Sequence, residues 1–207
     1  LPVTEAQAME CLEIIKGLQP DYLVASGSLP PGLPETFYQT VAQFAKSISA
    51  RLVLDTSGEA LLAAAGEGLY LLKPNLSELS ALAGVKKLEI NQVDDAAFRI
   101  IDQGKCEVVV VSLGAQGALL VTREGLEHIP APMVKKQSTV GAGDSMVGGM
   151  VWALSEGKSF VEMAQIGVAC GTAATMNLGT TLFHPEDVWK LQDWIARYAE
   201  KYRIRDF

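Results

Sequence analysis

Short apolar runs alternate along the chain with longer stretches in which apolar residues recur every three or four positions. A run without polar alternation, such as the valines at 108–111, is typical of a strand covered on both faces, and the longer spacing indicates amphipathic helices. The predicted strands cover residues 22–25, 51–54, 69–72, 108–111, 118–121 and 126–129, and the predicted helices cover residues 4–18, 34–46, 58–65, 74–82, 93–103, 143–155, 160–176 and 185–202. Strands that alternate with helices predict an α/β fold with a mostly parallel sheet.

Local signals mark where several of these elements begin and end. Thr4 is placed to cap the first helix, and Gly17 followed by Pro20 is expected to end it. Residues 123–125 separate the last two strands and predict a hairpin. No tract rich in glycine, serine or proline divides the chain, so a single domain over residues 1–207 is expected.

The loops after the predicted strands are the expected place for a ligand, because parallel sheets bind ligands beyond the carboxyl ends of their strands. Four polar segments lie there: residues 26–32, 55–59, 73–78 and 112–117. The candidate chemistry is therefore sought in these loops and at the helix starts.

Composition and charge narrow the class of protein. The chain has 207 residues, of which 49% are hydrophobic and 20% charged, enough for a core without disulfides. A net charge of −7 argues against binding to nucleic acid or to an anionic membrane surface. The sequence has no bilayer-spanning apolar run and no signal-peptide pattern at its start, and its three dispersed cysteines fit reduced thiols. A cytoplasmic location is therefore expected, and the first residue, a leucine, is consistent with a trimmed, processed or truncated chain.

The most informative segment is Ser138-Thr139-Val140-Gly141-Ala142-Gly143-Asp144-Ser145. Small residues ahead of a helix leave backbone N–H groups bare at its positive end, which favours a bound anion. Asp144 in the first turn is stabilised there as a carboxylate and could accept a proton from an attacking hydroxyl. Taken alone, the octet is equally consistent with an ordinary glycine-rich helix start that carries an acidic residue.

Three other segments have both a functional and a structural interpretation. Asn75 and Glu78 share a face at a helix start, where they could hold hydrated magnesium and nucleotide phosphates or simply cap the helix. Gly114 and Gly117 would let the backbone approach a ligand closely, or would make a turn. The small residues at 171–175 could flank a flat ring or allow tight helix packing.

Several familiar motifs are absent from the sequence. It has no G-x-x-x-x-G-K-[ST] loop, no G-x-S-x-G elbow, and no complete G-x-G-x-x-G fingerprint, because Met146 stands at the third glycine position. His128 and His184 are the only histidines and lack neighbours at metal-ligand spacing. A structural or solvated role is therefore expected for both.

Taken in order, these segments resemble the PfkB, or ribokinase-like, family of carbohydrate kinases. Thr139-Val140-Gly141-Ala142-Gly143-Asp144 is similar to the family signature T-x-G-A-G-D. Ser26-Gly27-Ser28-Leu29-Pro30-Pro31-Gly32 and Lys73-Pro74-Asn75-x-x-Glu78 resemble the branch with minor-type bacterial 6-phosphofructokinase, 1-phosphofructokinase and tagatose-6-phosphate kinase. The resemblance runs from about Tyr22 to the C-terminus and implies a three-layer α/β/α fold.

The resemblance implies a role for each matched residue. Asp144 would be the general base toward the sugar hydroxyl, Glu78 would hold Mg²⁺ through water, and Ser28 would lie near the sugar. The transferred γ-phosphoryl group of ATP would be bound by Gly141, Ala142 and Gly143. The nucleotide-binding residues would be Lys73, Asn75, Ser112, Gly114, Gly117, Val168, Thr172 and Asn177. A monovalent cation such as K⁺ would be bound by Ser138, Val140, Ala174, Asn177 and Gly179.

Two positions and the length depart from the family pattern. Ser138 stands where many ribokinase-like members carry Asp, although the phosphofructokinase-type branch is similar in having Ser there. Thr181 stands where close relatives often have Arg. The N-terminal part that supplies a sugar-binding segment and a β lid in the family is not identifiable. The chain is therefore expected to be the nucleotide-binding and catalytic portion of such a kinase, with an exposed sheet edge and apolar surface.

These implications predict an ATP-dependent kinase that phosphorylates a hydroxyl of a sugar phosphate. Fructose 6-phosphate is favoured over fructose 1-phosphate and tagatose 6-phosphate, and the intact protein is expected to be a homodimer. An alternative is a nucleotide-binding fragment without turnover. A vitamin or nucleoside kinase of the same superfamily is disfavoured by residues 26–32.

Overall fold

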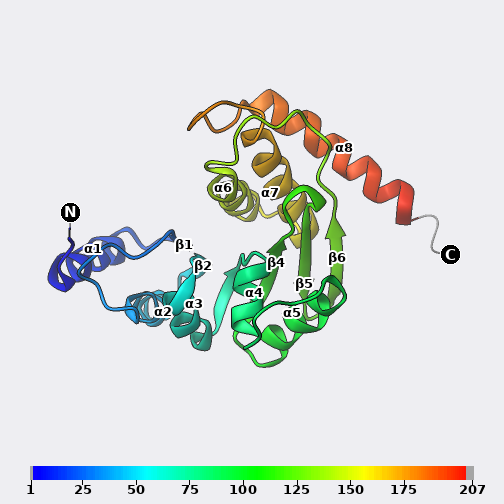
Figure 1. Cartoon of the computed structure of the whole chain (residues 1–207). Helices are drawn as coiled ribbons and strands as arrows, with labels where there is room; N and C mark the ends of the chain where they lie inside the picture. The colour runs from blue at the N-terminus through cyan, green and yellow to red at the C-terminus, as the bar shows by residue number, and fades with distance from the viewer. Residues whose placement is uncertain (1, 204–207) are drawn as a thin grey trace. The chain divides into compact units, whose positions relative to one another are not determined.

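The computed structural model describes residues 2–203, and this part of the chain forms alternating strands and helices (Figure 1). The strands are β1 (Tyr22–Ser26), β2 (Arg51–Asp55), β3 (Leu69–Leu72), β4 (Cys106–Ser112), β5 (Ala118–Thr122) and β6 (Gly125–Ile129). The α-helices are α1 (Glu5–Leu18), α2 (Phe37–Ser47), α3 (Gly58–Ala64), α4 (Leu76–Leu82), α5 (Val93–Asp102), α6 (Ala142–Ser155), α7 (Phe160–Ala174) and α8 (Pro185–Arg203). Three single 3-10 turns complete the elements: η1 (Ala65–Glu67), η2 (Ile90–Gln92) and η3 (Gly114–Gln116).

The strands form one six-stranded sheet in the order β1-β2-β3-β4-β5-β6. The first four strands pair in parallel, with Val53 opposite Leu71 and Leu71 opposite Val108. These three side chains are fully buried, as the apolar runs predict for strands covered on both faces. The α/β class with a mostly parallel sheet is thereby confirmed. The hairpin is also confirmed, because β5 and β6 are neighbours joined by only Arg123 and Glu124.

Contacts within the chain divide it into two compact units. Unit 1 comprises Leu1–Val111 with Val121–Gly125, and unit 2 comprises Ser112–Leu120 with Leu126–Phe207. In unit 1, α2 packs against α3 and the first two strands; in unit 2, α6 packs against α7, and α7 packs against α8. The single domain expected from the sequence stays a prediction.

Residues next to the ends of α1 determine where this helix begins and ends. Thr4 caps α1 with a capping box, in which its hydroxyl accepts from the Gln7 N–H and the Gln7 side chain accepts from the Thr4 N–H. The expected role of Gly17 in ending α1 is wrong, because Gly17 lies inside the helix. The left-handed C-cap position is occupied by Gln19 (φ 48°), and Pro20 follows it.

The edge of the sheet in unit 1 is exposed. Strand β1 has a single neighbour, β2, and Val24 in this strand is 42% exposed. The apolar side chains of Met9, Ile14 and Leu18 on α1 are also exposed. The expected exposed edge and apolar surface are therefore present among the described residues, and association through them remains a prediction.

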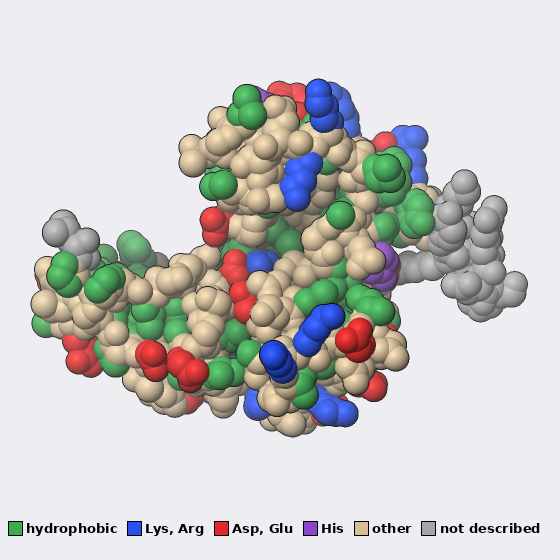
Figure 2. All heavy atoms as spheres, viewed as in Figure 1, with side chains coloured by type: hydrophobic (Ala, Val, Ile, Leu, Met, Phe, Trp, Pro, Cys, Tyr) green, Lys and Arg blue, Asp and Glu red, His purple; other side chains and the backbone are tan. Residues whose placement is uncertain are grey.

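The cysteines and the surface charge fit the expectations from composition. All three cysteines are free, and burial raises the pKa of Cys106 to about 12 and that of Cys170 to about 11, so both remain thiols at neutral pH. On the face seen in Figure 2, Lys and Arg side chains are scattered among Asp and Glu side chains. Within the described part of the chain, no helix is both long enough and apolar enough to cross a membrane.

Candidate active site

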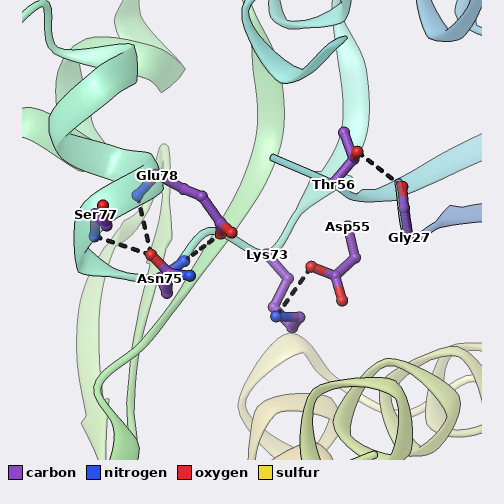
Figure 3. Close-up of polar contacts among 7 residues, drawn as sticks. All are labelled: Gly27, Asp55, Thr56, Lys73, Asn75, Ser77 and Glu78. Atoms are coloured by element: carbon purple, nitrogen blue, oxygen red, sulfur yellow. Dashed lines mark hydrogen bonds and ion pairs between the residues drawn. The ribbon is translucent and has the colours of Figure 1, made fainter. Parts of the chain in front are cut away.

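A buried ion pair lies at the carboxyl ends of β2 and β3 in unit 1 (Figure 3). Asp55 is the last residue of β2, and Lys73 directly follows β3. The Lys73 Nζ lies 3.1 Å from Asp55 Oδ1, with the two side chains only 7% and 16% exposed. The Lys73 N–H also donates to the Leu54 carbonyl, at 3.2 Å. The lysine that the resemblance assigns to nucleotide phosphates is thus held by a carboxylate at the ligand-binding edge of a parallel sheet.

Asp55 is the residue of this site that the sequence analysis did not single out. It appeared only within the polar segment 55–59, because nothing local shows which cation it meets. A sequence signal for such a pair does exist. One apolar strand ends in Asp, and Lys directly follows the next strand along the chain, so the two side chains meet if the strands are parallel neighbours. Pairing of β2 with β3 brings Leu54 opposite Leu72 and so places the next residue of each strand side by side.

The loop that leaves β1 is fixed to the end of β2. Gly27 N–H donates to the Asp55 carbonyl at 2.9 Å, and the Gly27 carbonyl accepts from Thr56 Oγ1 at 2.8 Å and from the Tyr38 hydroxyl at 3.0 Å. Burial, and secondly the nearby Asp55 carboxylate, raises the pKa of the Tyr38 hydroxyl, which therefore stays a donor. Ser28, the predicted sugar-side residue, is exposed and follows this fixed glycine.

Asn75 and Glu78 form a complete capping box at the start of α4. Asn75 Oδ1 accepts from the N–H groups of Ser77 and Glu78, both at 2.9 Å, and Glu78 Oε2 accepts from the Asn75 N–H at 2.8 Å (Figure 3). The capping interpretation is confirmed. Among the described residues, no three His, Cys, Asp or Glu side chains come together as a metal cage. The half-buried Glu78 carboxylate fits hydrated Mg²⁺ reached through water, and this role stays a prediction.

The start of α6 in unit 2 is built differently. Its N-cap is Gly141, in the left-handed conformation with φ 74° and ψ 2°, and no side chain caps the helix. Ala142 N–H donates to the Thr139 carbonyl at 3.3 Å and closes the turn that leads into the helix. Asp144 lies in the first turn and is exposed. The arrangement leaves an uncapped positive helix end next to a carboxylate, as the signature octet predicts.

Glycine at 141 is favoured by its backbone conformation. Its positive φ disfavours any residue with a Cβ, and a Cβ there would come within 2.6 Å of Leu182 Cδ2. Leu182 therefore lies directly against the turn that precedes α6. The sequence analysis did not identify this leucine, because it is far from the octet along the chain.

Of the predicted nucleotide residues in this region, Ser112 ends β4, and Gly114 and Gly117 lie in the loop that follows. Gly114 begins η3 with φ 61°. Gly117 has φ 93°, and a Cβ there would lie 2.0 Å from the Ile129 carbonyl oxygen. Gly117 is therefore needed because the Ile129 carbonyl lies so close to it. Its role in nucleotide binding stays a prediction. His128 Nε2 lies 2.8 Å from the carbonyl oxygen of Gln116 in this loop.

The small residues of α7 allow close packing against α6. A Cβ on Gly167 would lie 2.5 Å from Met150 Cγ, and one on Gly171 would lie 3.1 Å from the Ala142 carbonyl oxygen. The tight-packing interpretation of segment 171–175 is therefore confirmed at its first residue. Val168 is buried and Thr172 is half-buried on the same helix, and their proposed contact with adenine stays a prediction.

Two segments of unit 2 run together beside the start of α6. The N–H groups of Gln137 and Ser138 donate to the Thr175 carbonyl, at 2.7 and 3.3 Å. Ser138 Oγ donates to the Gly179 carbonyl at 3.2 Å and accepts from the Val140 N–H at 3.1 Å. Of the predicted cation ligands, Ser138 and Val140 lie in the first segment, Asn177 and Gly179 lie in the second, and Ala174 is the last residue of α7. Neutral carbonyl and hydroxyl oxygens fit a hard cation such as K⁺, which stays a prediction.

Known proteins resemble this chain over most of its length. The model of the pfkB family of carbohydrate kinases matches residues 4–187. The chain belongs to the pfkB family. It is 46% identical over 189 residues to the ATP-dependent 6-phosphofructokinase isozyme 2 of Escherichia coli K12, across 91% of this chain and 60% of that protein. It is 37% identical over 175 residues to the 1-phosphofructokinase of Bacillus subtilis 168, across 83% of this chain and 57% of that protein.

Solved structures of pfkB-type proteins are also similar. The structure of Escherichia coli phosphofructokinase-2 in complex with potassium superposes with a TM-score of 0.90 at 42% identity, covering 94% of this chain and 64% of that one. Arabidopsis thaliana ribokinase complexed with ribose and ATP shares the fold, with a TM-score of 0.71 at 24% identity. This pfkB-family chain spans about 60% of the length of the curated phosphofructokinase it matches.

Proposed function

We propose that the chain carries the phosphoryl-transfer site of an ATP-dependent sugar-phosphate kinase. The observation that carries this proposal is the start of α6, where Gly141 caps the helix without a side chain and Asp144 occupies the first turn. An uncapped helix start binds an anion, and an adjacent carboxylate can serve as a base. Membership of the pfkB family supports the same reaction class.

The proposed chemistry is an in-line transfer in which atoms and charge balance. Asp144 accepts the proton of the acceptor hydroxyl, the hydroxyl oxygen attacks the γ-phosphorus of ATP, and the bond to the β,γ-bridging oxygen breaks to release ADP. Backbone N–H groups of Gly141, Ala142 and Gly143 neutralise charge on the transferred group. Ala142 and Gly143 are the first two residues of α6 and Gly141 is its N-cap, so all three donors lie at the helix start.

The remaining residues bind the co-substrate and cations in this proposal. Lys73 and Asn75 lie toward the nucleotide phosphates, and Glu78 holds Mg²⁺ through water, where the ion would offset phosphate charge. The rest of the nucleotide site is formed by Ser112, Gly114, Gly117, Val168, Thr172 and Asn177. K⁺ would be bound by oxygens of Ser138, Val140, Ala174, Asn177 and Gly179, and the potassium complex of the Escherichia coli relative supports this choice.

Fructose 6-phosphate is the favoured acceptor, with Ser28 near the sugar. The relatives named above include a 6-phosphofructokinase and a 1-phosphofructokinase, so fructose 1-phosphate is the near alternative and tagatose 6-phosphate a third. The full protein is proposed to work as a homodimer; a tetrameric inhibited form is known for the Escherichia coli relative. Free cysteines are typical of a reducing compartment, which supports a cytoplasmic location.

The second candidate is nucleotide binding without turnover. The observation that favours it is the distribution of the proposed nucleotide residues between the two units. The nucleotide residues other than Lys73 and Asn75 all belong to unit 2, so a nucleotide site does not depend on a complete acceptor site.

One experiment separates the two candidates. ADP release by the 207-residue chain is measured with Mg-ATP and K⁺ against fructose 6-phosphate, fructose 1-phosphate, tagatose 6-phosphate and a blank without sugar. Sugar-dependent release supports the kinase and names its acceptor. Tight ATP binding with release no faster than the blank, in a folded sample, favours the nucleotide-binding chain.

A further inference from the structure

The segment that follows α7 lies against the turn that begins α6. Asn177 Nδ2 donates to the Ala173 carbonyl at 3.3 Å and to the Leu182 carbonyl at 3.0 Å, so Leu182 is tied back to the end of the helix. Thr181 N–H donates to the Leu178 carbonyl at 3.3 Å and closes a turn in between. Residues 177–182, here called the strap, are therefore a structured segment.

The strap contacts the turn before α6 at two points. Ser138 Oγ donates to the Gly179 carbonyl at 3.2 Å. The Leu182 methyl group Cδ2 lies only 2.6 Å from where a Cβ of Gly141 would be, so this methyl fills the side of the glycine that lacks a side chain. No side chain caps α6, so this packing supports a turn that has no cap of its own.

We infer that Leu182 is a positioning residue for the phosphoryl site, acting through Gly141. The inference rests on the proposed function, because it concerns the same helix start. A turn in the left-handed conformation without a capping side chain has few local interactions to fix its N–H directions. The Leu182 methyl limits movement of Gly141 on one side, and the hydrogen bond from Asn177 Nδ2 to the Leu182 carbonyl fixes the backbone that carries this side chain.

The expected kinetic consequence follows from where the N–H groups act. Fixed donors stabilise charge that develops in the transition state more than they stabilise bound ATP. Loosening the turn should therefore lower kcat and leave KM for ATP nearly unchanged. A merely structural role would lower the melting temperature without changing the kinetics of the folded fraction.

The test compares three variants in the full chain. Leu182→Ala removes the contact, Leu182→Met restores a side chain of similar reach, and Leu178→Ala removes a leucine of the same strap that is 71% exposed. The dissociation constants of ADP and of ADP with aluminium fluoride, which mimics the transferred phosphoryl group, are measured with Mg²⁺, K⁺ and fructose 6-phosphate present.

We expect Leu182→Ala to weaken ADP–aluminium fluoride binding by about tenfold, since a small misplacement of catalytic groups has an effect of this order or larger. ADP binding should change less than about twofold, as should both constants in Leu178→Ala, and Leu182→Met should recover most of the loss. Unchanged aluminium fluoride binding in Leu182→Ala, or an equal loss of ADP binding, overturns the inference.

Binding of ADP–aluminium fluoride to the unmodified chain distinguishes a failure of the proposed function from a failure of the Leu182 role alone. If the unmodified chain binds ADP–aluminium fluoride no more tightly than ADP, the helix start is not a phosphoryl site and the proposed function fails, together with the role of Leu182. If the unmodified chain shows the gain and Leu182→Ala keeps it, only the positioning role is wrong.

Discussion

The starts of α4 and α6 are two solutions to the same problem, four backbone N–H groups without partners at the beginning of a helix. At α4, Asn75 Oδ1 accepts from the N–H groups of Ser77 and Glu78, and Glu78 completes the box. At α6, the N-cap is Gly141, which has no side chain to accept these bonds. A capped start stabilises its own helix, whereas an uncapped one leaves its donors to a ligand.

Without a capping side chain, α6 is less stable on its own and depends more on its packing against other elements. A glycine at the N-cap costs roughly a few tenths of a kcal/mol in the free energy of unfolding, relative to Ser, Thr, Asn or Asp. Close packing against α7 supplies the compensation, as the lack of a Cβ on Gly149 allows Cys170 Sγ to approach within 2.6 Å of that position. In turn α7 carries a capping box of its own, formed by Ser159 and Glu162. The hydrogen bond from the Ser159 N–H, followed by that from its hydroxyl, lowers the pKa of Glu162 and keeps the box charged.

The largest effect is expected at the uncapped start. Asp144→Asn deletes the base while preserving shape, and should lower turnover by about 10³-fold, within the usual range for a general base. The measurement is sugar-dependent ADP release, with the dissociation constant for ATP as the control, expected to stay within about twofold. Full turnover in Asp144→Asn would show that another group accepts the proton.

Next in size is the ion pair at the edge of unit 1. Lys73→Met leaves the Asp55 carboxylate buried without its cation, and should lower the free energy of unfolding by about 3 kcal/mol. Chemical denaturation measures the loss, and the double variant Lys73→Met with Asp55→Asn should recover part of it, because the stranded charge is then also removed. A loss of less than about 1 kcal/mol in Lys73→Met is typical of an exposed ion pair and would contradict a buried pair between Lys73 and Asp55.

Glu78→Gln separates capping from metal binding. Glutamine can complete a capping box as glutamate does, so stability should be nearly unchanged, while the Mg²⁺ concentration for half-maximal rate should rise about tenfold. Glu162→Gln in the box of α7 is the matched control and should leave that concentration unchanged. If Glu78→Gln behaves like its control, Glu78 is a capping residue alone.

The smallest effect is expected at the cap of α4 itself. Asn75→Ala should lower the free energy of unfolding by about 1 kcal/mol, because two first-turn N–H groups lose their acceptor. Asn75→Asp keeps an acceptor in the same place and should retain most of the stability in thermal or chemical denaturation. Equal losses in both variants would mean that the box does not stabilise α4.

Signals that lie within a few residues of one another were read correctly from the sequence. The N-cap at Thr4, the alternative of a box at Asn75 and Glu78, and the glycine-rich start before Asp144 are all local patterns, and the structure contains each of them. The alternation of apolar runs and helical spacing was enough for the α/β class. One local expectation was wrong, since Gln19 rather than Gly17 takes the left-handed position after α1.

The amino-acid sequence by itself determined the order of the strands and helices along the chain and the family. Only the tertiary structure decided that Asp55 meets Lys73, that Gly117 is crowded by the Ile129 carbonyl, and that Leu182 lies against Gly141. The physical reason is the separation along the chain of the residues that interact. Caps and periodicity act between residues a turn apart, whereas these three contacts join distant residues that meet only through strand pairing and loop packing.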